Sequence, residues 1–351
     1  MSLTPVSAAD VLTRLDGYDT VIDARSEGEF ALDRLPGAVN WPSLNDAERA
    51  LIGTEYKQVS PFAARKRGAA LVARNVAMHI ERHVLDKPKD WQPLVYCWRG
   101  GQRSGALSLV LSQIGFRVQV IEGGYQAYRR AVMAALDVQP LQLRFRVVCG
   151  KTGSGKSRLL AALQTQGAQV LDLETLAHHR GSVLGRVPGS SQPTQKQFDT
   201  RVWNAMRRFD PEQPVWVESE SRKIGDLRVP ERLIDAMRTA PCVQLELPQD
   251  ARVALLMADY DFFVNDVPEF CARLDALRPL RGNDVVNRWQ TEARSGRIDS
   301  VVRELLVMHY DPVYLQSMQR NFAGFASALR LTPENGDAST WAGVAKKLLQ
   351  S

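Results

Sequence analysis

Short apolar segments alternate with helical patterns in the first part of the chain. Apolar strands are indicated at Thr20–Ala24, Leu94–Cys97 and Val118–Ile121. Residues 61–83 repeat apolar side chains every four positions, which is typical of an amphipathic helix, and another helix is indicated at Ser104–Ile114. Strands that alternate with helices in this way predict a parallel α/β sheet.

The second part of the chain restarts the same pattern after Gln139-Pro140, which we interpret as a linker. A strand at Leu143–Cys149 leads into a glycine-rich turn and a helix at Lys156–Gln166. We therefore predict two α/β domains, residues 1–138 and 139–351, the second with a helical C-terminal part. Its other expected elements are strands at Gln169–Leu173, Pro214–Glu218 and Cys242–Leu247, a mainly helical sequence beyond Asp250, and a closing helix within residues 333–351.

The composition is that of a globular protein. Of the 351 residues, 44% are hydrophobic and 24% are charged, and no run approaches the roughly 20 apolar residues that span a bilayer. The N-terminus lacks a basic start followed by an apolar run, so we expect no secretory signal and a cytoplasmic location. The net charge of +6 is shared by both halves, and it is compatible with a polyanionic partner or with ordinary solvated basic faces.

The four cysteines of the chain are far apart and form no Cys-x-x-Cys pair. Such spacing fits reduced thiols rather than disulfides or a zinc site, and we assign no metal ligand among them. Cys149 and Cys242 fit the pattern of small buried residues, whereas Cys271 is ambiguous. Only Cys97 lies in a sequence that suggests chemistry.

Cys97 follows a predicted strand and precedes a predicted helix, with the loop Trp98-Arg-Gly-Gly-Gln-Arg between them. Such a loop can direct backbone N–H groups toward one point, and the helix N-terminus adds positive potential there. Both effects favour a thiolate, which is a nucleophile and a good carrier of a bound chalcogen. Arg99 and Arg103 can pair with an anion held in the same loop. We therefore predict Cys97, Arg99 and Arg103 as catalytic residues.

The segment Gly150-Lys-Thr-Gly-Ser-Gly-Lys-Ser157 matches the phosphate-loop pattern G-x-x-x-x-G-K-[ST] between a strand and a helix. Backbone N–H groups would face phosphate oxygens, Lys156 would add a charge, and the Ser157 hydroxyl suits Mg²⁺ or a further phosphate oxygen. ATP or GTP is the usual ligand, but no base-recognition motif is evident, so another diphosphate ester stays open. Asp172 or Glu218 could hold a metal, or could cap a helix or form an ion pair instead. The predicted binding residues are Gly150, Thr152, Gly153, Ser154, Gly155, Lys156 and Ser157.

Four motifs of the first part resemble a rhodanese domain, in which the loop cysteine holds a persulfide. They are Asp23-Ala-Arg-Ser-Glu-Gly-Glu-Phe, Leu35-Pro-Gly-Ala-Val-Asn, the Cys97 loop and Glu122-Gly-Gly-Tyr. The loop departs from the sulfurtransferase pattern, because it closes at Arg103, six residues after Cys97 rather than five. Cys-x5-Arg is also the spacing of cysteine phosphatases. The wider loop fits a phosphate-bearing donor such as selenophosphate, and it keeps a phosphatase as an alternative.

The order of the two domains, together with further stretches, resembles the bacterial tRNA 2-selenouridine synthases over nearly the whole chain. The further stretches are Leu171–Ser182, Gln192–Phe198 and Glu218–Gly225. The resemblance implies an enzyme that acts on wobble 2-thiouridine in tRNA. It would first attach a geranyl group from geranyl diphosphate to the sulfur, and would then replace the geranylated sulfur with selenium from selenophosphate.

The resemblance also implies roles for residues of this chain. Cys97 would accept the selenium, while the phosphate loop would hold geranyl diphosphate, a ligand with which Mg²⁺ is compatible. Arg180 and Arg222 would add charge to that pocket or contact tRNA phosphates. Two alternatives stay open from the residues themselves. One is a cysteine phosphatase or sulfurtransferase fused to a nucleotide-dependent, kinase-like domain, and the other is a non-catalytic nucleotide switch that binds RNA. We interpret the polar histidines as structural; they are His178, His179 and His309.

Overall fold

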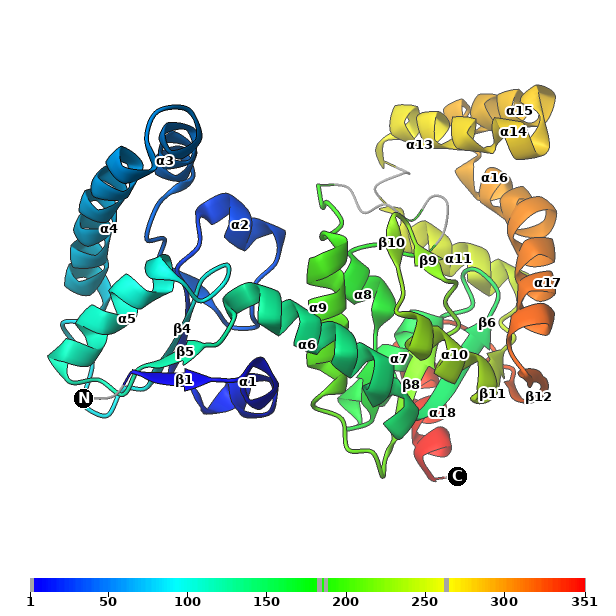
Figure 1. The fold of residues 1–351 in the computed structure, drawn as a ribbon. Helices are drawn as coiled ribbons and strands as arrows, with labels where there is room; N and C mark the ends of the chain where they lie inside the picture. Colours follow the sequence, from blue (N-terminus) through cyan, green and yellow to red (C-terminus); the bar gives the residue numbers. More distant parts are fainter. Residues whose placement is uncertain (1–2, 182–184, 186–188, 262–264, 351) are drawn as a thin grey trace. The chain divides into compact units, whose positions relative to one another are not determined.

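The chain divides into two compact units in a computed structural model (Figure 1). The model describes residues 3–181, 185, 189–261 and 265–350. The first unit comprises Met1–Leu136 and the separate segment Pro193–Asn204, and the second comprises Asp137–Gln192 and Ala205–Ser351. The first changeover lies near the domain boundary expected at residue 138. The return of Pro193–Asn204 to the first unit was not indicated by the sequence.

The first unit is built around a five-stranded, all-parallel sheet. Its strands are β1 (Thr4–Val6), β2 (Thr20–Asp23), β3 (Val39–Asn40), β4 (Pro93–Tyr96) and β5 (Gln119–Ile121), and its helices are α1 (Ala8–Arg14), α2 (Glu27–Leu32), α3 (Asp46–Gln58), α4 (Pro61–His83), α5 (Gln102–Ile114) and α6 (Gly124–Val138). The strand order is β1-β5-β4-β2-β3. Central strands β2 and β4 are nearly continuous apolar runs because the unit buries them on both faces. The predicted parallel sheet is confirmed, and its strand ends position the Cys97 loop.

The segment Pro193–Asn204 joins the first unit through helix α9 (Gln195–Met206). The Thr200 hydroxyl lies 3.2 Å from the carboxylate of buried Asp33, to which the Tyr125 hydroxyl donates a hydrogen bond of 2.8 Å. Burial raises the pKa of Asp33 in spite of these donors. Helix α9 therefore completes a buried polar network that the rest of the first unit would leave open.

The second unit contains another five-stranded parallel sheet, of order β12-β11-β6-β8-β7. Its strands are β6 (Arg144–Gly150), β7 (Gln169–Leu171), β8 (Pro214–Glu218), β11 (Pro241–Leu245) and β12 (Gly324–Leu331), its helices next to the sheet are α7 (Lys156–Thr165), α8 (Leu173–Ala177), α10 (Glu231–Thr239), α11 (Gln249–Asp259) and α18 (Ala338–Gln350), and β9 (Lys223–Ile224) pairs with β10 (Leu227–Arg228) in a small hairpin. Parallel strands end at one edge, so the loops after β6, β7 and β8 meet there.

A separate group of helices forms the C-terminal part of the second unit. These helices are α13 (Val267–Leu274), α14 (Arg278–Arg281), α15 (Asn283–Arg294), α16 (Ile298–Leu305) and α17 (Asp311–Asn321). They enclose their own core, which includes fully buried Trp289, Leu274 and Val301. The predicted helical C-terminal part is therefore confirmed. Among the described helices, none is both long enough and apolar enough to cross a membrane.

Two elements of the second unit differ from the sequence prediction. Strand β12 interrupts the region expected to be mainly helical; it is an edge strand whose residues are half-buried or exposed, so no apolar run marks it. The strand expected at Gln169–Leu173 ends at Leu171, because the Asp172 carboxylate accepts a hydrogen bond from the Thr175 N–H and begins helix α8. Asp172 thus serves as a helix cap.

Candidate functional site

Cys97 lies buried at the end of β4, where its loop leads into α5. The Ser104 hydroxyl donates a hydrogen bond to the Cys97 Sγ over 3.1 Å, and Ser104 is fully buried. Sequence reasoning did not assign Ser104 a role, although it directly follows Arg103. A donor fixed on the sulfur stabilises negative charge there, which suits a nucleophile or a leaving thiolate.

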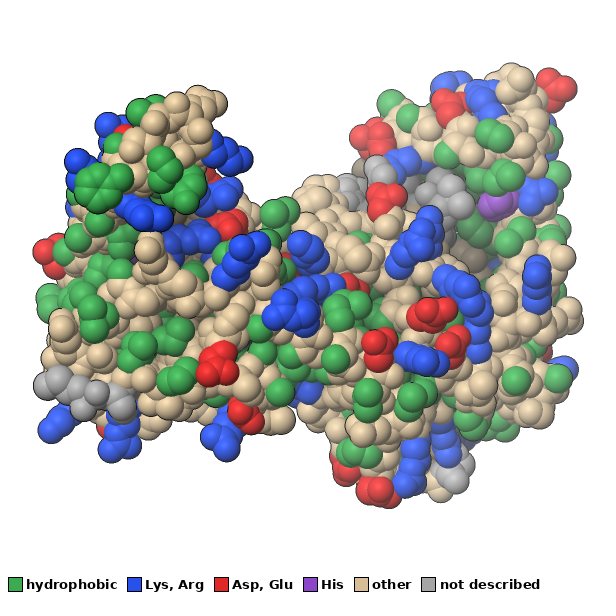
Figure 2. Space-filling view, viewed as in Figure 1, with side chains coloured by type: hydrophobic (Ala, Val, Ile, Leu, Met, Phe, Trp, Pro, Cys, Tyr) green, Lys and Arg blue, Asp and Glu red, His purple; other side chains and the backbone are tan. Residues whose placement is uncertain are grey.

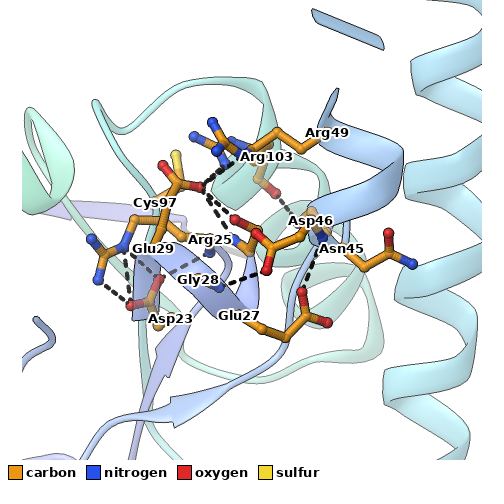
Figure 3. A network of polar contacts seen from close by, with 12 residues as sticks. Asp23, Arg25, Glu27, Gly28, Glu29, Asn45, Asp46, Arg49, Cys97 and Arg103 are labelled. Carbon is orange, nitrogen blue, oxygen red and sulfur yellow. Dashed lines mark hydrogen bonds and ion pairs between the residues drawn. The ribbon is translucent and has the colours of Figure 1, made fainter. Parts of the chain in front are cut away.

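The two predicted loop arginines have different surroundings. Arg103 donates to Glu29 Oε2 over 2.8 Å, and Arg49 at the start of α3 lies 3.8 Å from the same oxygen. Figure 3 shows these three side chains gathered beside Cys97. Burial opposes the ionisation of Glu29, but the hydrogen bond and charge of Arg103 outweigh it and lower the pKa of Glu29. The site therefore holds a carboxylate between two guanidinium groups, which the sequence did not predict.

Arg99 is exposed, and its Nε donates to the Gln126 side chain over 3.3 Å. The structure thus places Arg103 in the ionic group beside the sulfur, while it places Arg99 at the outer rim of the loop.

The Glu122-Gly-Gly-Tyr motif lets the Cys97 loop lie directly against the start of α6. Gly124 has a φ of +57°, and a Cβ there would lie 2.3 Å from the Cys97 carbonyl oxygen and 2.5 Å from the Gly100 nitrogen. The next residue, Tyr125, donates its backbone N–H to the same Cys97 carbonyl over 2.8 Å. A residue without a side chain is thus required at position 124 for this loop position.

The Asp23-Ala-Arg motif contributes a buried ion pair to the scaffold that supports the Cys97 loop. Arg25 Nη2 donates to Asp23 Oδ2 over 2.6 Å and also to the Asp33 carbonyl over 2.6 Å. Its guanidinium group lies 4.0 Å from the centre of the Tyr125 ring. Because both charges are paired and hydrogen-bonded, this motif holds the scaffold of the site rather than offering a charge to a ligand.

The phosphate loop joins β6 to α7 in the second unit, as predicted. Lys156 Nζ donates to the Gly150 carbonyl over 2.9 Å, so the ammonium group lies across the mouth of the loop. Gly155 caps α7 with a φ of +85°, and a Cβ there would lie 2.2 Å from the Trp341 ring. The carbonyl of Thr152 accepts from Arg252 Nη2 over 2.8 Å. These contacts hold the loop N–H groups open toward one side of the α7 N-terminus.

Within the same loop, Gly153 has a φ of +76°, and a Cβ there would lie 2.8 Å from Leu256 Cγ, while Ser154 is buried. The Tyr314 hydroxyl accepts a hydrogen bond from the Gly150 N–H, and Lys156 Nζ lies 5.8 Å from the centre of the Tyr314 ring. Sequence reasoning missed Tyr314, because it lies in α17, far from the loop in the chain.

Three glutamates gather next to the phosphate loop at the ends of β7 and β8. Carboxylate oxygens of Glu174, Glu218 and Glu220 lie within 4.8 Å of one another. Ser157 Oγ lies 3.4 Å from Glu174 Oε2. Of the two acids considered from the sequence, Glu218 belongs to this cluster and Asp172 does not.

This cluster has the chemistry of a divalent-cation site. Glu218 is fully buried, and neither of its carboxylate oxygens has a hydrogen-bond partner among the described residues. Burial, with the neighbouring carboxylates, raises the pKa of Glu218 well above its usual value. Burial also raises the pKa of Glu174 to about 7 and that of Glu220 to about 8. The three carboxylates offer only oxygen ligands, and they need a nearby positive charge to ionise fully. Both properties fit a site for Mg²⁺.

The two arginines proposed for the phosphate pocket lie in different places. Arg180 donates to the Asp259 carbonyl, lies 4.7 Å from the Tyr260 ring centre, and contributes a positive charge near Glu174. Arg222 is exposed in the turn before β9. The motif that contains Arg180 ends at Ser182, which lies outside the described residues.

His178, His179 and His309 lie in structural surroundings. His309 is buried, and its Nδ1 accepts a hydrogen bond from Arg281 over 3.1 Å. Burial, with the charge of Arg281, lowers the pKa of His309. His178 ends helix α8 in a left-handed conformation, and His179 is buried beside Gly225.

A parallel sheet that presents a cysteine loop, joined in one chain to a parallel sheet that presents a phosphate loop, defines a protein with a rhodanese-like domain and a P-loop-like domain. Comparisons with known proteins agree. A family model of the rhodanese-like domain matches residues 7–131, and a model of the AAA domain of tRNA 2-selenouridine synthase matches residues 143–282.

Relatives that match most of the chain identify its family. The chain is 37% identical to a tRNA 2-selenouridine synthase of Nitrosomonas europaea, over 90% of this chain and 94% of that protein. It is 34% identical to a tRNA 2-selenouridine synthase of Aeromonas salmonicida, over 85% of this chain and 87% of that protein. The chain therefore belongs to the tRNA 2-selenouridine synthase family.

Proposed function

We propose that the protein converts wobble 2-thiouridine of tRNA to 2-selenouridine through an S-geranyl-2-thiouridine intermediate. The strongest support for this assignment is that this chain, which belongs to the family, carries both a buried, hydrogen-bonded Cys97 and a complete phosphate loop. A two-step reaction needs two sites of these two kinds. The enzyme would act in the cytoplasm, where its tRNA substrate is found.

The phosphate loop would serve the geranyl step. The sulfur of 2-thiouridine attacks C1 of geranyl diphosphate, the C–O bond breaks, and diphosphate leaves with the electron pair. The loop N–H groups and Lys156 would stabilise that leaving charge, with Arg180 adding charge nearby. Glu174, Glu218 and Glu220 would hold Mg²⁺, which as a Lewis acid neutralises diphosphate oxygens. Exposed Arg222 better fits an RNA phosphate.

The Cys97 loop would serve the selenium step, with selenium carried on sulfur. The Cys97 thiolate attacks the selenium of selenophosphate, an S–Se bond forms, and the Se–P bond breaks with its electron pair left on phosphorus, so phosphite is released. The selenium anion then attacks C2 of the base and expels geranyl thiolate. A thiol from solution attacks the Cys97 sulfur, the S–Se bond breaks toward selenium, and a second thiol reduces the resulting mixed disulfide to restore Cys97. Arg103 and the loop amides would hold the phosphate of the donor, and Arg99 would guide it from the rim.

The Cys-x5-Arg spacing and the Ser104 hydrogen bond favour a second form of this step. Selenium of selenophosphate attacks C2 directly and expels geranyl thiolate, which leaves a phosphoryl group on selenium. The Cys97 thiolate then attacks that phosphorus, the Se–P bond breaks toward selenium, and water hydrolyses the phosphocysteine to phosphate. Ser104 would stabilise the thiolate as it leaves. This form needs no thiol and releases phosphate instead of phosphite.

Mass spectrometry of tRNA nucleosides tests the assignment. Purified protein is incubated with 2-thiouridine-containing tRNA and with geranyl diphosphate, selenophosphate or both. Wild type should form geranylthiouridine with the first donor alone and selenouridine with both, whereas Cys97→Ala should form no selenouridine. The variant should stop at geranylthiouridine in the carrier form and at the Se-phosphorylated nucleoside in the second form. Unchanged thiouridine in every sample, with folded protein, would contradict the assignment. Hydrolysis of simple aryl phosphates or transfer from ATP would then favour the fused phosphatase and kinase-like alternative, and thiosulfate activity a sulfurtransferase.

A further inference from the structure

Helices α3 and α4 form a hairpin inserted between β3 and β4 of the first unit, and its tip carries aromatic and basic side chains together. At the tip, Tyr56 is 48% exposed, Val59 75% and Phe62 67%. Basic residues lie among them; they are Lys57, Arg65, Lys66 and Arg67. The space-filling view shows hydrophobic and basic atoms mixed at the end of this hairpin (Figure 2). The mechanism proposed above uses none of these residues.

The cations of the tip are available to a ligand. Lys57, Arg65 and Lys66 are exposed and form no ion pair with any described residue. Lys66 Nζ lies 5.1 Å from the centre of the Phe62 ring, so the charge and the ring share one surface. Arg67 alone is paired, 3.4 Å from Glu55, the one acid among residues 55–67. The tip therefore has a net positive charge, which matches a polyanion.

The hairpin is a firm platform rather than a loose loop. The Ser60 hydroxyl caps α4 by accepting from the Ala63 N–H, and Pro61 occupies the first helical position. Gly68 is buried against Ile52, so the two helices approach closely. Near the base, buried Asn75 donates to the Ser43 carbonyl over 3.1 Å. Because the backbone already fixes these exposed rings, little conformational entropy is lost when a planar ligand binds to them.

The base of the hairpin belongs to the candidate active site. The Ser43 hydroxyl donates to the Arg103 carbonyl over 2.8 Å, and Arg49 on α3 lies 3.8 Å from Glu29, the partner of Arg103. Helix α3 has 13 residues, so the tip lies about 20 Å along the helix from that base. At about 3.4 Å per stacked nucleotide, this length corresponds to about six nucleotides.

We propose that the α3–α4 tip, residues 55–67, binds the unpaired loop of the tRNA substrate, with bases stacked on Tyr56 and Phe62 and phosphates held by Lys57, Arg65 and Lys66. Aromatic rings beside cations are the surface that single-stranded nucleic acid prefers, because every base has a face to stack and a phosphate to pair. This inference rests on the proposed function, since the wobble nucleotide of the same unpaired loop would be the one presented to Cys97.

Fluorescence anisotropy with a labelled anticodon stem–loop and with a loopless duplex of the same stem tests the inference. Tyr56→Ala/Phe62→Ala should weaken stem–loop binding at least fivefold and leave duplex binding within twofold, because stacking requires unpaired bases. Arg65→Ala/Lys66→Ala should weaken binding and reduce the slope of log affinity against log salt by about 1.4. The matched control is Lys346→Ala/Lys347→Ala, which removes two exposed cations of α18 and should leave affinity and slope unchanged.

The outcomes separate the two proposals. If wild type binds the stem–loop and both tip variants bind it equally well, the inference fails while the proposed function stands. If wild type binds no tRNA, both fail. If the tip variants lose binding to vesicles with anionic lipids but keep their RNA affinity, the tip is a membrane contact and the inference is overturned. Circular dichroism and the melting temperature check that each variant is folded.

Discussion

Gly124→Ala should disable the selenium step by moving the Cys97 loop. The added Cβ would lie 2.3 Å from the Cys97 carbonyl oxygen and 2.5 Å from the Gly100 nitrogen, both backbone atoms. Ordinary contact begins near about 3.4 Å, so the loop must retreat by about 1 Å. A left-handed alanine adds roughly 1–2 kcal/mol of backbone strain. Since a displacement of about 1 Å can cost about 10²-fold in rate, we expect a loss of that order.

Gly37→Ala is the matched control for this substitution. Gly37 has a φ of +72°, but a Cβ there would meet no atom within 4 Å. An alanine at position 37 therefore carries the same backbone strain but does not displace the Cys97 loop. In single-turnover assays from geranylated tRNA and selenophosphate, Gly124→Ala should form selenouridine about 10²-fold more slowly, and Gly37→Ala at nearly the wild-type rate. Both should geranylate 2-thiouridine normally. A folded Gly124→Ala enzyme with wild-type selenium transfer would refute the reasoning.

Three further variants test the two sites. Lys156→Ala should slow geranylation by about 10²–10³-fold while pre-geranylated tRNA is still selenated; equal losses in both assays would argue against separate sites. Ser104→Ala should slow only the selenium step, by about tenfold or more, because it removes the hydrogen bond to Cys97. Burial raises the pKa of Glu174 to about 7 and that of Glu220 to about 8, whereas the usual value is 4.5. Between these pH values the folded state therefore keeps protons that the unfolded state has released. Without divalent cation, the free energy of unfolding should therefore fall between about pH 5 and pH 8, less so in Glu174→Gln/Glu220→Gln, and Mg²⁺ should raise the melting temperature more at pH 8 than at pH 6. Thermal melts at several pH values measure this, and an equal Mg²⁺ effect at both would contradict it.

The Cys97 loop and the phosphate loop could be predicted from the sequence because each is defined by residues that are adjacent in the chain. A cysteine between a strand and a helix, and glycines before Lys156, needed no tertiary information. Residues contributed by distant segments were not predictable in this way. Glu29 and Arg49 reach Arg103 from α2 and α3, and Tyr314 reaches the phosphate loop from α17.

The fold shows the same limit. Buried parallel strands such as β4 and β8 are apolar runs and were predicted, whereas edge strand β12 is half exposed and has no such run. The return of α9 to the first unit rests on hydrogen bonds such as that of Thr200 with Asp33, which no local pattern encodes. Glu174 and Glu220 were not singled out from the sequence, and they join Glu218 because β7 and β8 pair side by side in the sheet.

The central claim is that Cys97 is the nucleophile of the selenium step, and intact-protein mass spectrometry tests it most directly. The enzyme is incubated with selenophosphate, desalted, and then given geranylated tRNA and a thiol without further donor. The carrier account predicts one selenium atom on Cys97, release of phosphite, and passage of that selenium into tRNA in stoichiometric amount. In a parallel sample that keeps selenophosphate and geranylated tRNA together, a phosphoryl group on Cys97 with phosphate released would support the second form. Unmodified Cys97 throughout, with Cys97→Ala equally active, would contradict the claim.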